Sequence, residues 1–199
     1  MPITRRSLFL ASFVGLAGLA VLPGLHAADK PAAQPAQPAP GIHGQKVNGV
    51  YQGPVEIWST PLTREAAGNF HNGKPDGVWT FWDREGLKIA EITYRDGTFN
   101  GTVTMWNDTE AGPEARGKLK FRGSFNDGMW QGSVLTYYPD GKTRSERDYE
   151  ADTLKAAYAY NPAGREFNEE YSKKIAASDE KHDNAYVDAL DAFILKWVR

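Results

Sequence analysis

The central part of the chain alternates between apolar and polar residues in short runs, which is the pattern of half-buried β-strands. The clearest copy spans residues 72–95 and reads NGKPDGVWTFWDREGLKIAEITYR. It predicts a first strand over residues 77–82, a tight glycine-containing turn at residues 83–86, and a second strand over residues 87–94. The unit is therefore interpreted as a β-hairpin.

This hairpin recurs along the chain at a fixed period. Trp58, Trp82 and Trp106 are 24 residues apart, and each follows a glycine by five residues. A fourth copy ends at Tyr137, and a fifth at Tyr160 has lost its glycine. A period of this size indicates a small unit stacked several times. We therefore expect a mainly β protein, a single-layer antiparallel sheet of four to five stacked β-hairpin repeats with a C-terminal amphipathic α-helix.

The turns between successive hairpins share a four-residue motif. Its first position is aromatic, its second is variable, its third is Asn or Asp, and its fourth is glycine. Another glycine follows four residues after that one. It occurs at residues 70–73, 94–97 and 125–128. In these stretches, and over about residues 48–165, the chain resembles the MORN-repeat family, most closely its bacterial variant. The resemblance implies a fold of stacked hairpins. It constrains function poorly, because proteins with this repeat include scaffolds, lipid-associated modules and bacterial antitoxin-type proteins.

The chain departs from this repeat pattern in two places. An insertion around residues 109–118 lengthens the third interval and predicts a projecting loop. In the last copy, Lys155 or Ala156 stands where glycine is expected, which predicts a capping unit at the end of the stack.

Alternation assigns the residues of each first strand to two faces of the sheet. The second and fourth residues after each repeat glycine are mostly apolar and predict the core: Val55, Ile57, Trp79, Phe81, Val103, Met105, Val134 and Thr136. On the other face, Trp58, Trp82, Trp106 and Tyr137 should form an aromatic ladder along one edge. The favoured interpretation is that these rings pack under the C-terminal helix or between neighbouring turns. The alternative is a stripe that binds a peptide strand or the apolar faces of sugars.

The C-terminal segment changes period. From Asn168 onward it has neither glycine nor proline, and its apolar residues recur at helical spacing. The pattern predicts an amphipathic helix over residues 184–199, with Asp183 or Asn184 as its N-cap, inside a C-terminal helical cap at residues 166–199. We expect this helix to cover the open end or the polar-aromatic face of the sheet. Partner binding is the alternative.

The N-terminus has the pattern of an export signal. Arg5 and Arg6 precede an apolar run, so residues 1–27 are predicted to be a signal peptide cleaved near Ala27. The arginine pair also resembles a twin-arginine signal, but ordinary Sec secretion is favoured because Leu8 stands where that signal usually has Phe. No integral membrane segment is expected after cleavage.

The remaining domain boundaries follow from composition. Residues 28–44 are rich in Ala, Pro and Gln and predict a disordered linker. Residues 45–165 hold the repeats. Without the arginines of the signal, 21 basic side chains face 25 acidic ones, a formal charge of −4, and the two signs are interleaved along the chain. This argues against nucleic acid as a partner. The absence of cysteine excludes disulfides and thiolate metal sites.

No catalytic, cofactor or metal motif stands out. His43, His71 and His182 are far apart in the sequence, and neither a serine elbow nor a phosphate loop is present. We therefore expect a periplasmic or secreted, non-enzymatic repeat protein that binds a protein partner. One version, which the resemblance to antitoxin-type proteins implies, is an immunity-type inhibitor of a periplasmic effector. The alternative is a cell-wall or polysaccharide-binding protein that uses the aromatic ladder. A hydrolase with an irregular site is a third class.

Overall fold

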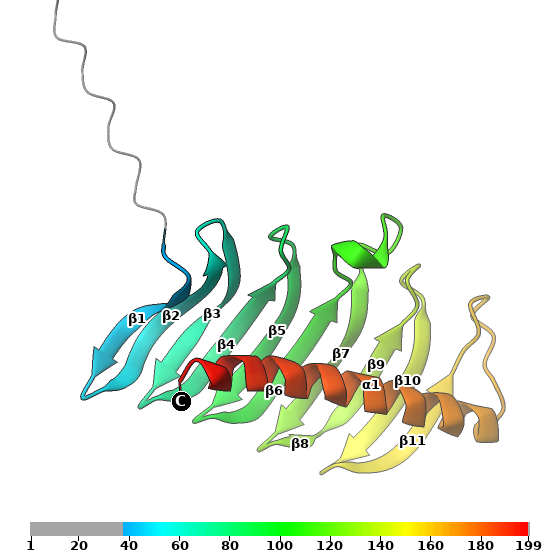
Figure 1. Ribbon diagram of the computed structural model, residues 1–199. Helices are drawn as coiled ribbons and strands as arrows, with labels where there is room; N and C mark the ends of the chain where they lie inside the picture. Colours follow the sequence, from blue (N-terminus) through cyan, green and yellow to red (C-terminus); the bar gives the residue numbers. More distant parts are fainter. Residues whose placement is uncertain (1–37, 199) are drawn as a thin grey trace, which may run out of the picture. The chain divides into compact units, whose positions relative to one another are not determined.

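A computed structural model describes residues 38–198, which form one antiparallel β-sheet with a long helix packed on one face (Figure 1). The strands follow one another across the sheet in chain order, except that β8 pairs only with β7. Their bounds are β1 Gly41–Val47, β2 Val50–Thr60, β3 Thr63–His71, β4 Lys74–Trp82, β5 Lys88–Arg95, β6 Thr98–Trp106, β7 Leu119–Asn126, β8 Met129–Trp130, β9 Gly132–Tyr137, β10 Thr143–Glu150 and β11 Thr153–Ala159. The α-helix α1 spans Glu169–Lys196, and a short 3-10 helix, η1, spans Thr109–Ala111. The predicted fold class is confirmed.

The hairpins of the repeat are complete four times. They are β2–β3, β4–β5, β6–β7 and β9–β10, and β11 begins a fifth. The sheet starts with β1 at Gly41, so its first strand lies partly inside the segment predicted as linker. The predicted signal peptide and most of that linker lie outside the described residues.

The turns that join one hairpin to the next also bind the repeats together. At Asp96 and Gly97 both central residues have positive φ, 47° and 84°, as a type I′ turn requires. The Gly97 N–H donates to the carbonyl of Pro75, one repeat earlier, at 2.8 Å. The same bond recurs from Gly73 to Tyr51, from Gly128 to Phe99 and from Asp152 to Trp130.

The core lies on the face of the sheet that α1 covers, here called the inner face. The eight residues predicted for the core are all buried on it, from Val55 to Thr136. The second strands add four buried aromatic residues at equivalent positions, Phe70, Tyr94, Phe125 and Tyr149. The ring of Phe125 stacks on that of Trp130, with centroids 3.9 Å apart. Large rings therefore form a substantial part of the inner face, beside aliphatic residues such as Val103.

Helix α1 differs from the prediction in length and in place. It begins at Glu169, with the Asn168 side chain accepting a hydrogen bond from the N–H of Tyr171 at 2.9 Å, instead of near Asn184. It does not cover the polar-aromatic face, but lies along the apolar inner face, where Val187 packs into the core, and its first turn lies beyond β11 at the open end of the sheet. The apolar face is the one whose burial is most favourable. Helical apolar spacing revealed only the second half of α1, because the first half contacts the sheet through polar residues.

Candidate functional site

The predicted aromatic ladder lies near the ends of the first strands and away from the helix-covered face. Trp58, Trp82, Trp106 and Tyr137 are all half-buried, in β2, β4, β6 and β9. In the first three strands the register shifts immediately before the tryptophan. Such bulges re-aim the side chains that follow them. Trp58 and Trp82 lie beside the β2–β3 and β4–β5 turns, one of the two positions that the favoured interpretation named, and Trp82 also borders the C-terminal end of α1.

Basic side chains lie between the tryptophans. The guanidinium carbon of Arg64 is 4.1 Å from the centre of the Trp82 ring, and Nζ of Lys88 is 4.5 Å from the centre of the Trp106 ring. Both distances are within the range of cation–π attraction. We call the alternating row of Trp58, Arg64, Trp82, Lys88 and Trp106 the outer stripe.

Carboxylates hold the outer stripe in place. Glu56 accepts hydrogen bonds from Nε1 of Trp58 at 3.2 Å and from Nη1 of Arg64 at 2.7 Å. Glu91 accepts one from Nζ of Lys88 at 2.9 Å. These side chains are roughly two-fifths exposed, and ion pairs of this kind stabilise a fold by only about 0–1 kcal/mol. Their main effect is to restrict the rotamers of the stripe.

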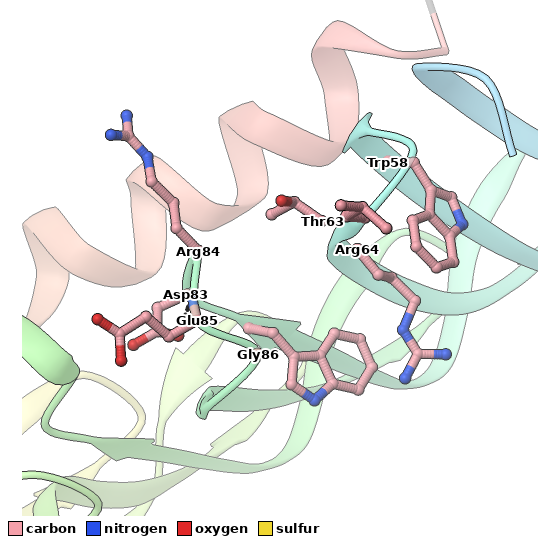
Figure 2. A pocket seen from close by; sticks show the side chains of 9 residues that line it. Trp58, Thr63, Arg64, Asp83, Arg84, Glu85 and Gly86 are labelled. Carbon is pink, nitrogen blue, oxygen red and sulfur yellow. Dashed lines mark hydrogen bonds between the residues drawn. The ribbon is translucent and has the colours of Figure 1, made fainter. Parts of the chain in front are cut away.

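A groove of about 460 Å³ opens between the β2–β3 turn and the β4–β5 turn (Figure 2). Trp58 and Trp82 both line it, together with Arg64. Leu62, on the β2–β3 turn, also lines it and is 79% exposed. The structure thus brings two of the four predicted ladder residues into one groove, whereas Trp106 and Tyr137 do not line it.

Trp82 also contacts the helix side of the sheet. It lines a smaller hollow of about 190 Å³ with Phe81, Ile89, Leu190 and Phe193. This indole therefore connects the groove with the apolar side chains at the C-terminal end of α1.

The insertion between β6 and β7 is held against the β4–β5 turn, next to the groove. Thr109 donates to Oδ2 of Asp83 from its N–H, at 3.1 Å, and from its Oγ1, at 2.9 Å. Partial burial acts to raise the pKa of Asp83, but hydrogen bonds from Leu87, Thr109 and Glu85 outweigh it and lower the pKa. The insertion, predicted as a projecting loop, is thus anchored to the neighbouring hairpin.

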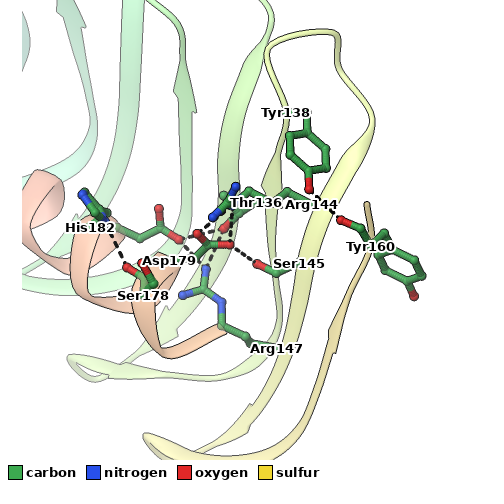
Figure 3. Close-up of polar contacts among 10 residues, drawn as sticks. Thr136, Tyr138, Arg144, Ser145, Arg147, Tyr160, Ser178, Asp179 and His182 are labelled. Atoms are coloured by element: carbon green, nitrogen blue, oxygen red, sulfur yellow. Dashed lines mark hydrogen bonds and ion pairs between the residues drawn. The ribbon is translucent and has the colours of Figure 1, made fainter. Parts of the chain in front are cut away.

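Sequence reasoning missed a buried polar cluster between α1 and strands β9 and β10 (Figure 3). Asp183 accepts hydrogen bonds from Oγ1 of Thr136, at 2.9 Å, and from Nη2 of Arg147. Asp179 accepts one from Oγ of Ser145 at 2.7 Å. The Arg147 and Asp183 side chains are only 1% and 4% exposed. Asp183, predicted as an N-cap, is instead an anchor of the helix to the sheet.

Burial has visible consequences in this polar cluster. It raises the pKa of Asp183, although the Arg147 charge and the Thr136 hydroxyl oppose the shift. It also raises the pKa of Tyr149, whose Oη, like Nε of Arg147, is buried without a hydrogen-bond partner among the described residues. A signal for the cluster was present in the sequence, since Ser145 and Arg147 are polar residues at core positions of a second strand.

The histidines serve local structure. His71 lies 3.3 Å from Oδ1 of Asp96, and His182 lies 3.0 Å from the carbonyl of Ser178. Among residues 38–198, no three His, Asp or Glu side chains are arranged to hold a metal ion. Within the same residues no helix combines the length and apolar character needed to cross a membrane.

Comparison with protein-family models and with curated proteins gave no match for this chain. The functional interpretation therefore depends on the geometry of the site.

Proposed function

We propose that the chain is an exported, non-enzymatic repeat protein that binds a protein partner through the outer stripe and the adjoining groove. One observation carries the proposal. The helix occupies the inner face, and no described element covers Trp58 and Trp82 on the groove side. Half-exposed indoles and a guanidinium, fixed beside an exposed leucine, are the residue types that dominate binding energy at protein interfaces.

The stripe favours a protein over a glycan. Arg64 and Lys88 already lie against the rings of Trp82 and Trp106. A sugar that stacks on those rings would compete with the cations for the ring faces that they occupy, whereas a protein partner can pair its carboxylates with them. The immunity-type version of the function is supported by the resemblance to antitoxin-type repeat proteins alone.

Partner capture followed by mutagenesis tests the proposal. The tagged, full-length chain is expressed in a bacterium, cross-linked in the periplasmic extract and purified with its partner. The double variant Trp58→Ser/Trp82→Ser should weaken the complex at least about 100-fold, because interface tryptophans commonly contribute 2 kcal/mol or more each. Tyr186→Ser changes an exposed aromatic residue of α1 and is the matched control.

Three results would contradict the proposal. They are recovery of the chain without a partner, an affinity that the double variant leaves unchanged, and binding to peptidoglycan or a glycan array that depends on Trp58 and Trp82. The last result would establish the glycan alternative. Export is checked separately by fractionating cells that express the chain with and without residues 1–27.

A further inference from the structure

The fifth hairpin of the stack is incomplete. The first strands β2, β4, β6 and β9 each have a neighbouring strand on both sides, whereas β11 pairs with β10 alone. After β11 the chain makes the turn of the other hairpins, with the N–H of Gly164 bonded to the carbonyl of Asn161 at 2.8 Å. It then forms a single bridge, Tyr160 with Glu166, and enters α1 through Asn168. The rest of the second strand is missing.

The free edge of β11 presents unpaired backbone groups. Ala159 uses its outward N–H and C=O, since the N–H donates to Oγ of Ser172 and the C=O accepts from the N–H of Phe167. Backbone groups point in alternate directions along a strand, so the N–H and C=O of Ala157 also point outward. Neither has a hydrogen-bond partner among the described residues. An unpaired edge of this kind is a template for a further strand.

A groove lies where the missing strand would run. It has a volume of about 380 Å³ and is lined by four consecutive residues of the edge, 155–158, and by Glu166, Glu169, Ser172 and Lys173. In Figure 1 the first turn of α1 lies beyond β11, so the helix forms one wall of this groove. This region also has three large side chains that are 40–49% exposed, those of Leu154, Tyr158 and Tyr171.

We infer that this groove binds an extended segment of a partner protein, which pairs antiparallel with β11 and completes the fifth hairpin. Addition of a strand to a free sheet edge is a common mode of peptide recognition, in which backbone bonds give affinity and alternate side chains give specificity. Ala157 stands where the other first strands have valine or tryptophan, and this leaves room for a large residue opposite it. The complete hairpins place an aromatic residue two positions further along, such as Tyr94, so the segment should carry one as well.

A second copy of the chain fits the groove less well. Antiparallel pairing of β11 with its own copy would place Lys155, Ala157 or Ala159 opposite Ala157 on the same face of the sheet, so a copy offers no aromatic residue there. A partner segment is not restricted in this way.

A peptide with the sequence of the second strand of the second hairpin, residues 90–96 (AEITYRD), is the probe. Added at millimolar concentration to the full-length chain, it should slow hydrogen exchange of the Ala157 amide and shift its NMR signal in a saturable way. Tyr158, whose amide already faces β10, should change little. N-methylation of the peptide at its isoleucine removes the donor that faces Ala157 and should abolish binding. N-methylation at the neighbouring threonine, whose N–H points away from β11, should leave binding intact.

The variant Ala157→Pro tests the same backbone pairing by changing β11 instead of the peptide. It removes an edge N–H that makes no bond to β10, so the sheet should fold, which circular dichroism checks. Peptide binding should be lost, while Trp58→Ser/Trp82→Ser should bind the peptide like the unmodified chain. Absence of saturable binding, equal binding of both N-methylated peptides, or a β11-mediated dimer in sedimentation experiments would each overturn the inference.

Discussion

Helix α1 is held to the sheet in two different ways along its length. Toward its C-terminus the contacts are apolar, with Ile194 fully buried and the Phe193 ring 6.5 Å from that of Phe81. Toward its N-terminus the buried helix residues include Asp179 and Asp183, which bind polar groups of β9 and β10. One helix thus combines an apolar half and a polar half on the same face of one sheet.

The two halves contribute differently to the fold. Apolar burial is non-directional, so it stabilises many placements of the helix almost equally. A buried charge is tolerated only where its partner meets it, so the pair of Arg147 and Asp183 penalises every other placement. We infer that the polar half sets the register of α1 along the sheet, and that the apolar half supplies the free energy of docking.

The largest effect is expected from breaking the polar half. Asp183→Ala leaves the Arg147 guanidinium buried without its carboxylate, which should lower the free energy of unfolding by about 3–5 kcal/mol. Guanidinium chloride unfolding measures this loss. The double variant Arg147→Met/Asp183→Leu removes both charges and should recover most of the stability. A single variant that costs less than about 1 kcal/mol would show that the pair is not desolvated as described.

The apolar half should respond by loss of packing alone. Ile194→Ala should cost about 2–5 kcal/mol, because it opens a cavity at a side chain that has no exposed surface. Ile194→Val, the graded control, should cost about 0.5–1.5 kcal/mol. Both losses, measured by urea unfolding, should be the same in low and high sodium chloride concentrations. A strong salt dependence would contradict the assignment of this half.

The same contrast explains what could be predicted from the sequence. Hairpins and the inner face follow from the glycine period and from alternation at residues such as Val55 and Trp79, because these signals are local. The polar half of α1 was missed, since Asp179 and Asp183 have no apolar spacing and their partners are about 35 residues away in β10. An amphipathic helix is recognised in a sequence by the helical spacing of its buried apolar residues, and the polar half of α1 buries aspartates at those positions.

The candidate site was predicted in part for a similar reason. The tryptophans of the stripe are periodic and therefore visible, but Arg64 and Lys88 reach them from the neighbouring hairpins. Each cation precedes its tryptophan by 18 residues. This second periodicity relates a basic residue to an aromatic residue, whereas the first relates one tryptophan to the next. The groove depends on two turns that approach each other only in the stacked fold.

Asn184 marks the boundary between the two halves and should have an intermediate effect. Its Oδ1 accepts a hydrogen bond from Nε1 of Trp130 at 2.9 Å. Asn184→Ala leaves this indole without its acceptor and should cost about 1 kcal/mol in urea unfolding. Asn184→Asp keeps an acceptor oxygen and should cost less. Equal losses in the two variants would mean that the bond to Trp130 does not hold the helix.

The smallest effect concerns the one polar anchor inside the apolar half. Burial raises the pKa of Asp191 above its ordinary value of 3.8, a hydrogen bond from Oη of Tyr94 at 3.2 Å opposes the shift, and the charge of Asp188 adds to it. The folded chain therefore binds this proton more tightly than the unfolded chain does. The resulting stability is fully present below pH 3.8 and is lost as the pH rises through the folded pKa.

Asp191→Asn cannot titrate, so the stability of the unmodified chain relative to this variant should fall as the pH rises from below 3.8. The change should stay below about 1 kcal/mol because Asp191 is only half-buried. Tyr94→Phe removes the opposing hydrogen bond, so in that background the decline should extend to higher pH. Urea unfolding at a series of pH values measures both differences. A relative stability that rises with pH would mean that the hydrogen bond from Tyr94 outweighs burial, and that this anchor behaves like a contact of the polar half.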